Sequence, residues 1–201
     1  MPRRDALRNL QERLSERMQS STHSVRRALW LAVIAHGGAA PTPQAGRYLL
    51  PLAEAGEVFP FVTPSPVPHT RPWFLGVAHL RGGLWGAVDL AAYLAEEAVH
   101  QTPDARPRLP VTDARCGLSV ARLITLHPDL GSGAALRIDR LVGLRAPDAF
   151  TPAPRSNAGA AFGPRYVDAQ GQTWQSLDLV ALSRESRFLS PAQPAHPAVG
   201  G

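Results

Sequence analysis

Short apolar segments separated by glycine- and proline-rich stretches make up most of the chain after residue 28. They lie at residues 28–35, 47–52, 55–61, 73–80, 84–88, 121–126 and 134–144. Segments of this length, bounded by turn-forming residues, are typical of β-strands. Residues 166–177 add a predicted hairpin around a turn at 168–171. Frequent short strands of this kind indicate a mainly β fold built from small barrels.

Three segments have helical patterns instead. Residues 5–19 carry an apolar stripe at spacings of three and four, formed by Leu7, Leu10, Leu14 and Met18. This pattern predicts an amphipathic helix, which could dock on the rest of the chain or bind a partner. Short helices are also predicted over 89–98 and 178–188. Each begins at an aspartate, Asp89 or Asp178, whose carboxylate can accept hydrogen bonds from the free N–H groups of the first helical turn.

The connections between these elements are rich in proline and glycine. Prolines 60, 64, 66 and 68 exclude regular structure just before residue 73, because proline lacks a backbone donor and restricts the residue before it. Further loops are predicted over 36–46, 101–117 and 146–161. We therefore expect a leader helix in residues 1–25, a β domain in residues 26–189 and a disordered tail in residues 190–201.

A short sequence repeat links two of the predicted strand–helix units. Gly82, Trp85 and the triplet Val88-Asp89-Leu90 recur at the same spacing 89 residues later, as Gly171, Trp174 and Leu177-Asp178-Leu179. Chance or a structural repeat could produce so short a match. A structural repeat would mean that two similar small β units make up the domain.

The net charge of +5 does not by itself indicate a nucleic-acid-binding protein. Residues 1–30 contain seven arginines against three acids, whereas the rest of the chain contains 14 against 13. The predicted β domain is therefore nearly neutral, and a nucleic-acid-binding domain should carry a basic face. Aromatic residues make up 6% of the chain, and the tryptophans lie in apolar strand patterns, which favours core packing over base stacking.

The sequence contains no recognisable catalytic or cofactor-binding motif. The H-E-x-x-H, G-x-S-x-G and P-loop patterns are absent, and the seven histidines have no metal-ligand spacing. The single cysteine, Cys116, cannot form an internal disulfide. The longest apolar run, residues 28–35, is much shorter than the about 20 residues of a membrane-spanning helix. We expect a cytoplasmic protein that is not an enzyme, needs no cofactor or metal and does not insert into the membrane.

Residues 46–94 contain a more specific pattern. It consists of Tyr48, Glu57-Val58, a proline-containing link, Gly76-Val77, Leu80-Arg81-Gly82 and Val88-Asp89-Leu90. This order resembles the signature of the CheW family of adaptors in bacterial chemosensory signalling. The stretches 63–76 and 177–189 are most similar to the PilI-type members, which serve twitching-motility systems. The resemblance extends over about residues 28–190, and His79 stands where the family usually has asparagine.

The resemblance implies a fold of two small five-stranded β-barrels around a shared apolar core, with short capping helices. It implies an adaptor that binds the cytoplasmic tip of a chemoreceptor on one surface and the regulatory domain of a CheA-type histidine kinase on another, at membrane-associated chemosensory arrays. For a PilI-type protein the output would be type IV pilus twitching motility. A CheW-like scaffold of another pathway is one alternative. An oligonucleotide-binding small barrel is the alternative from a different class.

The resemblance also implies roles for individual residues. The residues expected on the receptor side are Ala55, Glu57, His79 and Arg81. Glu57 and Arg81 are expected to form an ion pair that orients the guanidinium, a strong interface anchor. Structural roles are expected for Gly76, Gly82, Asp89, Asp178, Trp73 and Trp85, with Gly82 either in a turn of positive φ or at a close approach of the backbone to another group. Ala55 and the Trp73-Phe74 pair could lie in the receptor groove or in the seam between the barrels.

Overall fold

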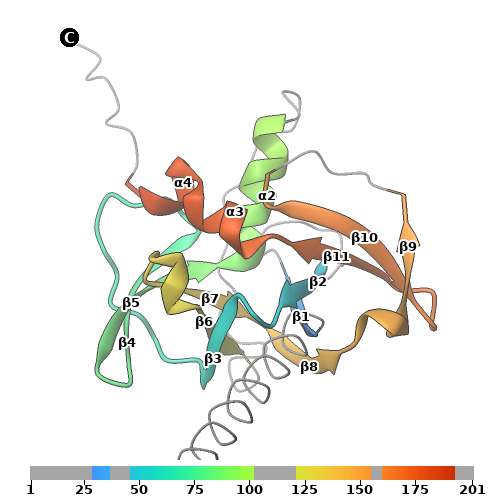
Figure 1. The fold of residues 1–201 in the computed structure, drawn as a ribbon. Helices are drawn as coiled ribbons and strands as arrows, with labels where there is room; N and C mark the ends of the chain where they lie inside the picture. The colour runs from blue at the N-terminus through green and yellow to red at the C-terminus, as the bar shows by residue number, and fades with distance from the viewer. Residues whose placement is uncertain (1–28, 37–45, 102–120, 155–159, 193–201) are drawn as a thin grey trace, which may run out of the picture.

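The computed structural model describes residues 29–36, 46–101, 121–154 and 160–192 (Figure 1). The fold is mainly β, as predicted, with two mixed sheets and short helices packed beside them. The predicted leader helix over residues 5–19 lies outside the described residues, as do Cys116 and residues 193–201.

The first sheet contains six strands in the order β8-β1-β2-β11-β10-β9. They are β1 (Trp30–Ala35), β2 (Gly46–Pro51), β8 (Arg140–Arg145), β9 (Phe150–Ala153), β10 (Phe162–Asp168) and β11 (Thr173–Leu177). Neighbouring strands are antiparallel except β2 and β11, which run parallel. This parallel pair joins the first described strands of the chain to the last.

The second sheet contains five strands in the order β3-β6-β7-β5-β4. They are β3 (Ala55–Pro60), β4 (Phe74–Leu80), β5 (Gly83–Asp89), β6 (Arg122–Leu126) and β7 (Ala134–Ile138). Here β5 and β7 form the parallel pair, and the other neighbours are antiparallel. Among the described residues no ladder joins β3 to β4 or β8 to β9, so closure of either sheet into a barrel stays a prediction.

The two sheets repeat one pattern of strand pairing, which supports a structural origin for the sequence repeat. Starting from β3 or from β8, each has two antiparallel pairs, one parallel pair and a further antiparallel pair, and β9 is an addition to the first sheet. The hairpin β4–β5 leads into helix α2 (Leu90–Gln101), and the hairpin β10–β11 leads into helix α3 (Leu179–Arg184). The turns contain Gly82 and Gly171, with φ of +78° and +74°.

Two aspartates begin the helices as the sequence predicts. An oxygen of Asp89 accepts a hydrogen bond from the N–H of Ala92 at 3.0 Å, and one of Asp178 accepts from the N–H of Ala181 at 2.7 Å. The single helix predicted over 178–188 is wrong, because α3 ends before Glu185 and a separate helix α4 (Ser186–Leu189) follows. Glu185 is extended, with φ −65° and ψ 126°, and its carboxylate accepts from the buried Tyr93 hydroxyl.

A shared core, the largest buried apolar cluster, joins the two sheets and the helices. It includes Leu31, Val33 and Leu50 of the first sheet, Ile124 and Leu136 of the second, and Leu90, Tyr93 and Leu179 of the helices. Each sheet also buries a smaller cluster formed by the alternate residues of its strands, such as Ala32 and Leu123. Strands with apolar residues on both faces explain why the sequence shows continuous apolar runs rather than alternation.

Two other sequence predictions are wrong for tertiary reasons. Residues 134–144 do not form one strand, since β7 belongs to the second sheet, β8 to the first, and Asp139 lies between them. The N–H of Asp139 donates to the carbonyl of Ile34 at 3.0 Å, which ties this crossing to β1. The predicted loop over 146–161 contains η2 (Pro147–Ala149) and strand β9, whose Phe150 ring packs 5.6 Å from that of Trp30.

The segment before β4 and the end of the described chain lie side by side. The N–H of Arg71 donates to the carbonyl of Pro191 at 2.8 Å, and Thr70 forms a β-bridge with Ala192. Nearer β4, Ser65 bridges Val77, with two backbone hydrogen bonds of 2.8 Å. The proline-rich segment therefore covers the edge of the second sheet at β4, which would otherwise present unpaired backbone groups.

Gly76 is the residue on which this covering contact depends. It has φ of +124°, and a Cβ atom there would lie 2.1 Å from the backbone oxygen of Ser65. We expect Gly76→Ala to reduce the free energy of unfolding by about 3 kcal/mol or more, since both the dihedral strain and the backbone clash must be relieved. Gly82→Ala is the control, because its φ is also positive but nothing lies within 4 Å of the added methyl, so about 1–2 kcal/mol is expected. Urea denaturation measures both, and equal losses would contradict this account.

Candidate functional site

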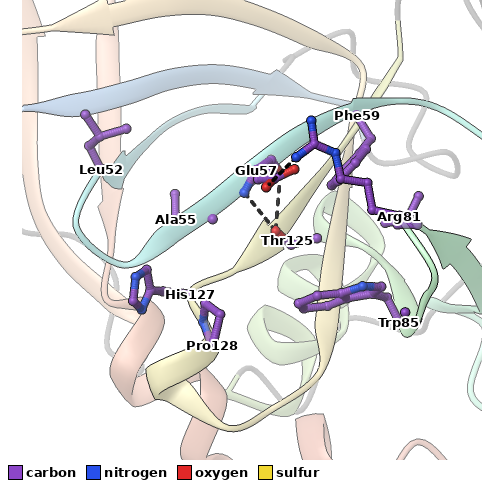
Figure 2. Close-up of a pocket in the computed structure, with 12 residues that line it drawn as sticks. Leu52, Ala55, Glu57, Phe59, Arg81, Trp85, Thr125, His127 and Pro128 are labelled. Atoms are coloured by element: carbon purple, nitrogen blue, oxygen red, sulfur yellow. Dashed lines mark hydrogen bonds and ion pairs between the residues drawn. The ribbon is translucent and has the colours of Figure 1, made fainter.

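A groove of about 410 Å³ opens between β3, the turn of the β4–β5 hairpin and the end of β6 (Figure 2). Its principal lining residues are Ala55, Glu57, Phe59, Leu80, Arg81 and Trp85. The volume falls within the range of about 300–1,000 Å³ usual for ligand sites. Its wall is apolar where Leu80 and Trp85 lie, and its rim is charged where Glu57 and Arg81 lie.

The turn between β4 and β5 holds Arg81 in an unusual conformation. Leu80 pairs with Gly83, so Arg81 and Gly82 are the two central residues of the hairpin. Both have positive φ, +45° and +78°, as a type I′ turn requires. A side chain other than glycine, asparagine or aspartate is unfavourable there, by roughly 1–2 kcal/mol in the left-handed region. The arginine is thus kept at this position against the preference of the backbone.

Arg81 forms the predicted ion pair with Glu57. Its Nη1 atom donates to the Oε1 atom of Glu57 at 3.0 Å, and its guanidinium carbon lies 5.9 Å from the centre of the Phe59 ring (Figure 2). The side chains of Arg81 and Glu57 are 75% and 55% exposed, so the pair contributes only about 0–1 kcal/mol to stability. Its effect is to hold the guanidinium over the groove, on the side of β3.

Thr125 on β6 holds the backbone of Glu57 through its hydroxyl group. Its hydroxyl accepts from the N–H of Glu57 at 2.8 Å and lies 3.3 Å from the carbonyl of the same residue. The register of β3 against β6 shifts between Ala55 and Val58, and the hydroxyl satisfies backbone groups that the shifted ladder leaves unpaired. Gly56 makes room for it, because a Cβ atom there would lie 2.4 Å from the hydroxyl oxygen.

The family model described as the CheW-like domain matches residues 44–187, more than half of the chain. The chain belongs to the CheW-like domain family. This is a family of scaffold proteins rather than enzymes, and membership supports a role in chemosensory coupling.

A solved structure shows the same fold. The chain is similar to the scaffolding protein TtCheW from Thermoanaerobacter tengcongensis, with a TM-score of 0.51 and 16% sequence identity. The match covers 76% of this chain and 85% of that one. No protein in the curated comparison matches the sequence.

The groove of this CheW-like domain brings together three of the four residues predicted for the receptor side. Ala55, Glu57 and Arg81 line it, and Ala55 is also part of the shared core. His79 does not line it, because in the hairpin it pairs with Leu84, on the face opposite Leu80 and Trp85. His79 and Leu84 are both exposed, Leu84 by 69%.

The two tryptophans assigned structural roles lie in different places. Trp85 lines the groove, and its indole packs so close to Gly83 that a Cβ atom there would lie 3.0 Å from the ring nitrogen. Trp73 is buried in the shared core, where its ring lies 5.0 Å edge-on from Tyr93 and 6.5 Å from the parallel ring of Phe188. Of the two positions considered for Trp73, the structure therefore shows the seam.

Sequence reasoning missed several groove residues that come from other elements. They are Leu52, Phe59, Thr125, His127 and Pro128. Thr125 had a signal in the sequence, as a hydroxyl side chain within an apolar strand. Leu52, His127 and Pro128 had none, since they meet the site only because the chain turns after β2 and β6. The N–H of His127 donates to the carbonyl of Glu54 at 2.8 Å and holds these two turns together.

Buried and half-buried polar groups connect the groove side of the domain with the seam. The Oε2 atom of Glu54 accepts from the N–H of Leu179 at 2.9 Å, which links the turn after β2 to the start of α3. The Tyr93 hydroxyl of α2 donates to Glu185, and the guanidinium of Arg187 lies 4.2 Å from the Tyr93 ring centre. Burial, and then the hydrogen bond to Glu185, raise the pKa of the Tyr93 phenol well above its ordinary value. This hydroxyl therefore stays protonated as a donor.

The described part of the chain contains neither a candidate metal cluster nor a candidate membrane-spanning helix. Within the described ranges, no group of three or more His, Cys, Asp or Glu side chains is placed to hold a metal ion. Nor does the described part of the chain contain a helix long and apolar enough to cross a membrane.

Removal of the Thr125 hydroxyl should weaken the groove wall. We expect Thr125→Val to lower the free energy of unfolding by about 1–3 kcal/mol, because the N–H of Glu57 loses its acceptor. Thr125→Ser is the matched control, since it keeps the hydroxyl and removes only a methyl group, at about 1 kcal/mol. Urea denaturation compares them. A serine variant that loses more stability than the valine variant would contradict the role given to the hydroxyl.

Glu54 should make stability depend on pH. Burial raises its pKa above the ordinary value, the hydrogen bond from Leu179 opposes this, and the charge of Asp178 adds to the rise. A carboxyl with a raised pKa in the folded state stabilises the fold below its unfolded pKa, and this contribution is lost as pH rises through the folded pKa. Glu54→Gln should therefore be more stable than the wild type at pH 7, while the gain disappears below about pH 4.

Thermal denaturation between pH 3.5 and 8 measures this difference. The amide oxygen of the substituted glutamine can still accept from the N–H of Leu179, so the hydrogen bond is retained in the variant. Asp148→Asn, which removes an exposed carboxylate of η2, is the control for the loss of one negative charge. A Glu54→Gln gain that is constant over this range would contradict the assignment.

Proposed function

We propose that this protein is an adaptor that couples chemoreceptors to a CheA-type histidine kinase, in a pathway that controls twitching motility by type IV pili. It would work in the cytoplasm, at membrane-associated arrays, without catalytic activity or a cofactor. The observation that carries the proposal is Arg81, held in a left-handed turn at the rim of a groove with apolar walls and paired there with Glu57. Strain kept at one exposed side chain is typical of functional sites.

The groove has the chemistry that a receptor tip requires. An α-helical hairpin presents apolar side chains at helical spacing, and Leu80, Phe59 and Trp85 supply apolar surface for them. Aromatic residues and arginine dominate the energetics of such interfaces. Arg81 and Glu57 at the rim can meet charged residues of either sign on the receptor helix. We therefore assign the receptor side to Ala55, Glu57 and Arg81, and add Phe59 and Trp85.

Two segments support the narrower proposal of a PilI-type adaptor. The stretches 63–76 and 177–189, in which the sequence is most similar to PilI-type proteins, pack against each other. The Trp73 ring is parallel to that of Phe188, and Arg71 donates to Pro191, just beyond the second stretch. The two stretches thus contact each other on the side of the domain where α4 lies, and their joint similarity to PilI-type proteins supports the narrower proposal.

Arg81→Asn separates a binding role from a structural role. Asparagine tolerates the left-handed conformation, so relief of strain should offset the lost ion pair, and we expect the free energy of unfolding to change by less than about 1 kcal/mol. Binding of the receptor tip should weaken about ten-fold or more, as for an interface anchor. Binding of the kinase regulatory domain should be unchanged. Arg140→Asn, at an exposed arginine of β8, is the matched control.

Calorimetry at two salt concentrations, with the receptor tip, the kinase regulatory domain and a single-stranded oligonucleotide, tests the proposal. An adaptor should bind the first two with a weak dependence on salt. Strongly salt-dependent binding to the oligonucleotide alone would overturn the adaptor function, because phosphate contacts release counterions. Receptor binding that is equal in the wild type and Arg81→Asn would overturn the site assignment.

A further inference from the structure

The chain enters the described fold beside the groove. The carbonyl of Leu29, the first described residue, accepts from the N–H of Leu52 at 3.0 Å, and Leu52 lines the groove. Residues 1–28 therefore join the domain at one edge of the candidate receptor site. Any structure that they form is tethered there.

The sequence of this tethered segment matches what the groove could hold. Residues 5–19 have the pattern of an amphipathic helix, with a narrow apolar stripe of Leu7, Leu10, Leu14 and Met18. A helix with anchors at these spacings is the usual occupant of an apolar groove. The charged residues on its other faces have both signs: Arg8, Glu12, Arg13, Glu16 and Arg17. The rim of the groove offers one partner for each sign, Glu57 and Arg81, both more than half exposed.

The length of the chain permits the contact. Between the predicted helix and Leu29 lie residues 20–28, and an extended chain spans up to about 3.3–3.6 Å per residue. Nine residues thus reach about 30 Å, while the predicted helix itself is only about 22 Å long at 1.5 Å per residue. A helix tethered beside Leu52 can therefore turn back onto the groove.

We propose that residues 1–25 fold back as an amphipathic helix and occupy the groove between β3 and the β4–β5 turn, in competition with the partner helix. The competition rests on the proposed receptor-binding function, whereas the intramolecular docking does not. Because the segment is part of the same chain, its effective concentration at the groove is of the order of 1 mM. An intrinsic dissociation constant of about 100 μM would then leave the groove open in about one molecule in ten, and weaken receptor binding about ten-fold.

Trp85 provides a probe of docking in the full-length chain, since it lines the groove and residues 1–28 contain no tryptophan. The protein is labelled with 5-fluorotryptophan and observed by fluorine NMR. The Trp85 resonance is identified as the one that is missing from the spectrum of Trp85→Phe. The double variant Leu10→Asp/Leu14→Asp removes two apolar anchors of the stripe. Asn9→Asp/Gln19→Asp is the matched control, because it adds the same charge on the side of the predicted helix away from the stripe. We expect only the first variant to shift the Trp85 resonance, with those of Trp30, Trp73 and Trp174 unchanged.

Affinity for the receptor tip is then measured by calorimetry on the same full-length proteins. Leu10→Asp/Leu14→Asp should bind about ten-fold more tightly than the wild type, and the control should not. A Trp85 shift with no receptor binding by any protein would support the docking and overturn the proposed function. Receptor binding with an unshifted Trp85 would overturn the docking and leave the proposed function standing. If the difference in the Trp85 resonance between the wild type and Leu10→Asp/Leu14→Asp disappears on dilution, the segment docks on a second copy. That result would overturn intramolecular docking.

Discussion

The structure depends on one shared apolar core, which neither sheet could replace alone. Each sheet buries one apolar face in this core against the other unit, so either sheet alone would expose that face to water. The contact is made by Leu31 and Val33 from one side, by Ile124 and Leu136 from the other, and by the ring cluster around Trp73. The parallel pairing of β2 with β11 builds the first sheet from distant parts of the chain. The first sheet therefore needs both ends of the domain, whereas the strands of the second come from residues 55–138 alone.

The same core fixes the groove. Ala55 belongs to both, so β3 cannot move relative to the seam without exposing apolar surface. Glu54 and His127 then tie the turns after β2 and β6 to each other and to α3. On this rigid base the type I′ turn presents Arg81, and Glu57 and Phe59 direct its guanidinium. A preorganised anchor loses little conformational entropy on binding, which suits a scaffold that acts only through its contacts.

The order of the strands along the chain could be predicted, but their assignment to sheets could not. Apolar runs bounded by glycine and proline located every strand except β9, and Asp89 and Asp178 marked two helix starts. The division of residues 134–144 at Asp139 could not be predicted, because the residues on both sides of it are similarly apolar. It depends on a tertiary contact, the hydrogen bond from the N–H of Asp139 to Ile34. β9 was missed because Pro152 argues against a strand, although an edge strand tolerates proline. Glu185 breaks a helix that its neighbours favour, in order to accept from Tyr93.

For the site, local sequence determined the residues that a turn or a cap requires. The positive φ of Gly82 could be predicted because glycine favours such a turn, whereas the positive φ of Arg81 runs against its local preference. Tertiary structure decided everything that needs two distant strands: that Thr125 holds the backbone of Glu57, that Trp85 lines a groove while Trp73 fills the seam, and that His79 points away. Apolarity predicts that a side chain is buried, but it does not say against which partner. The packing of two sheets around one core makes that choice, since it alone determines which strand faces meet.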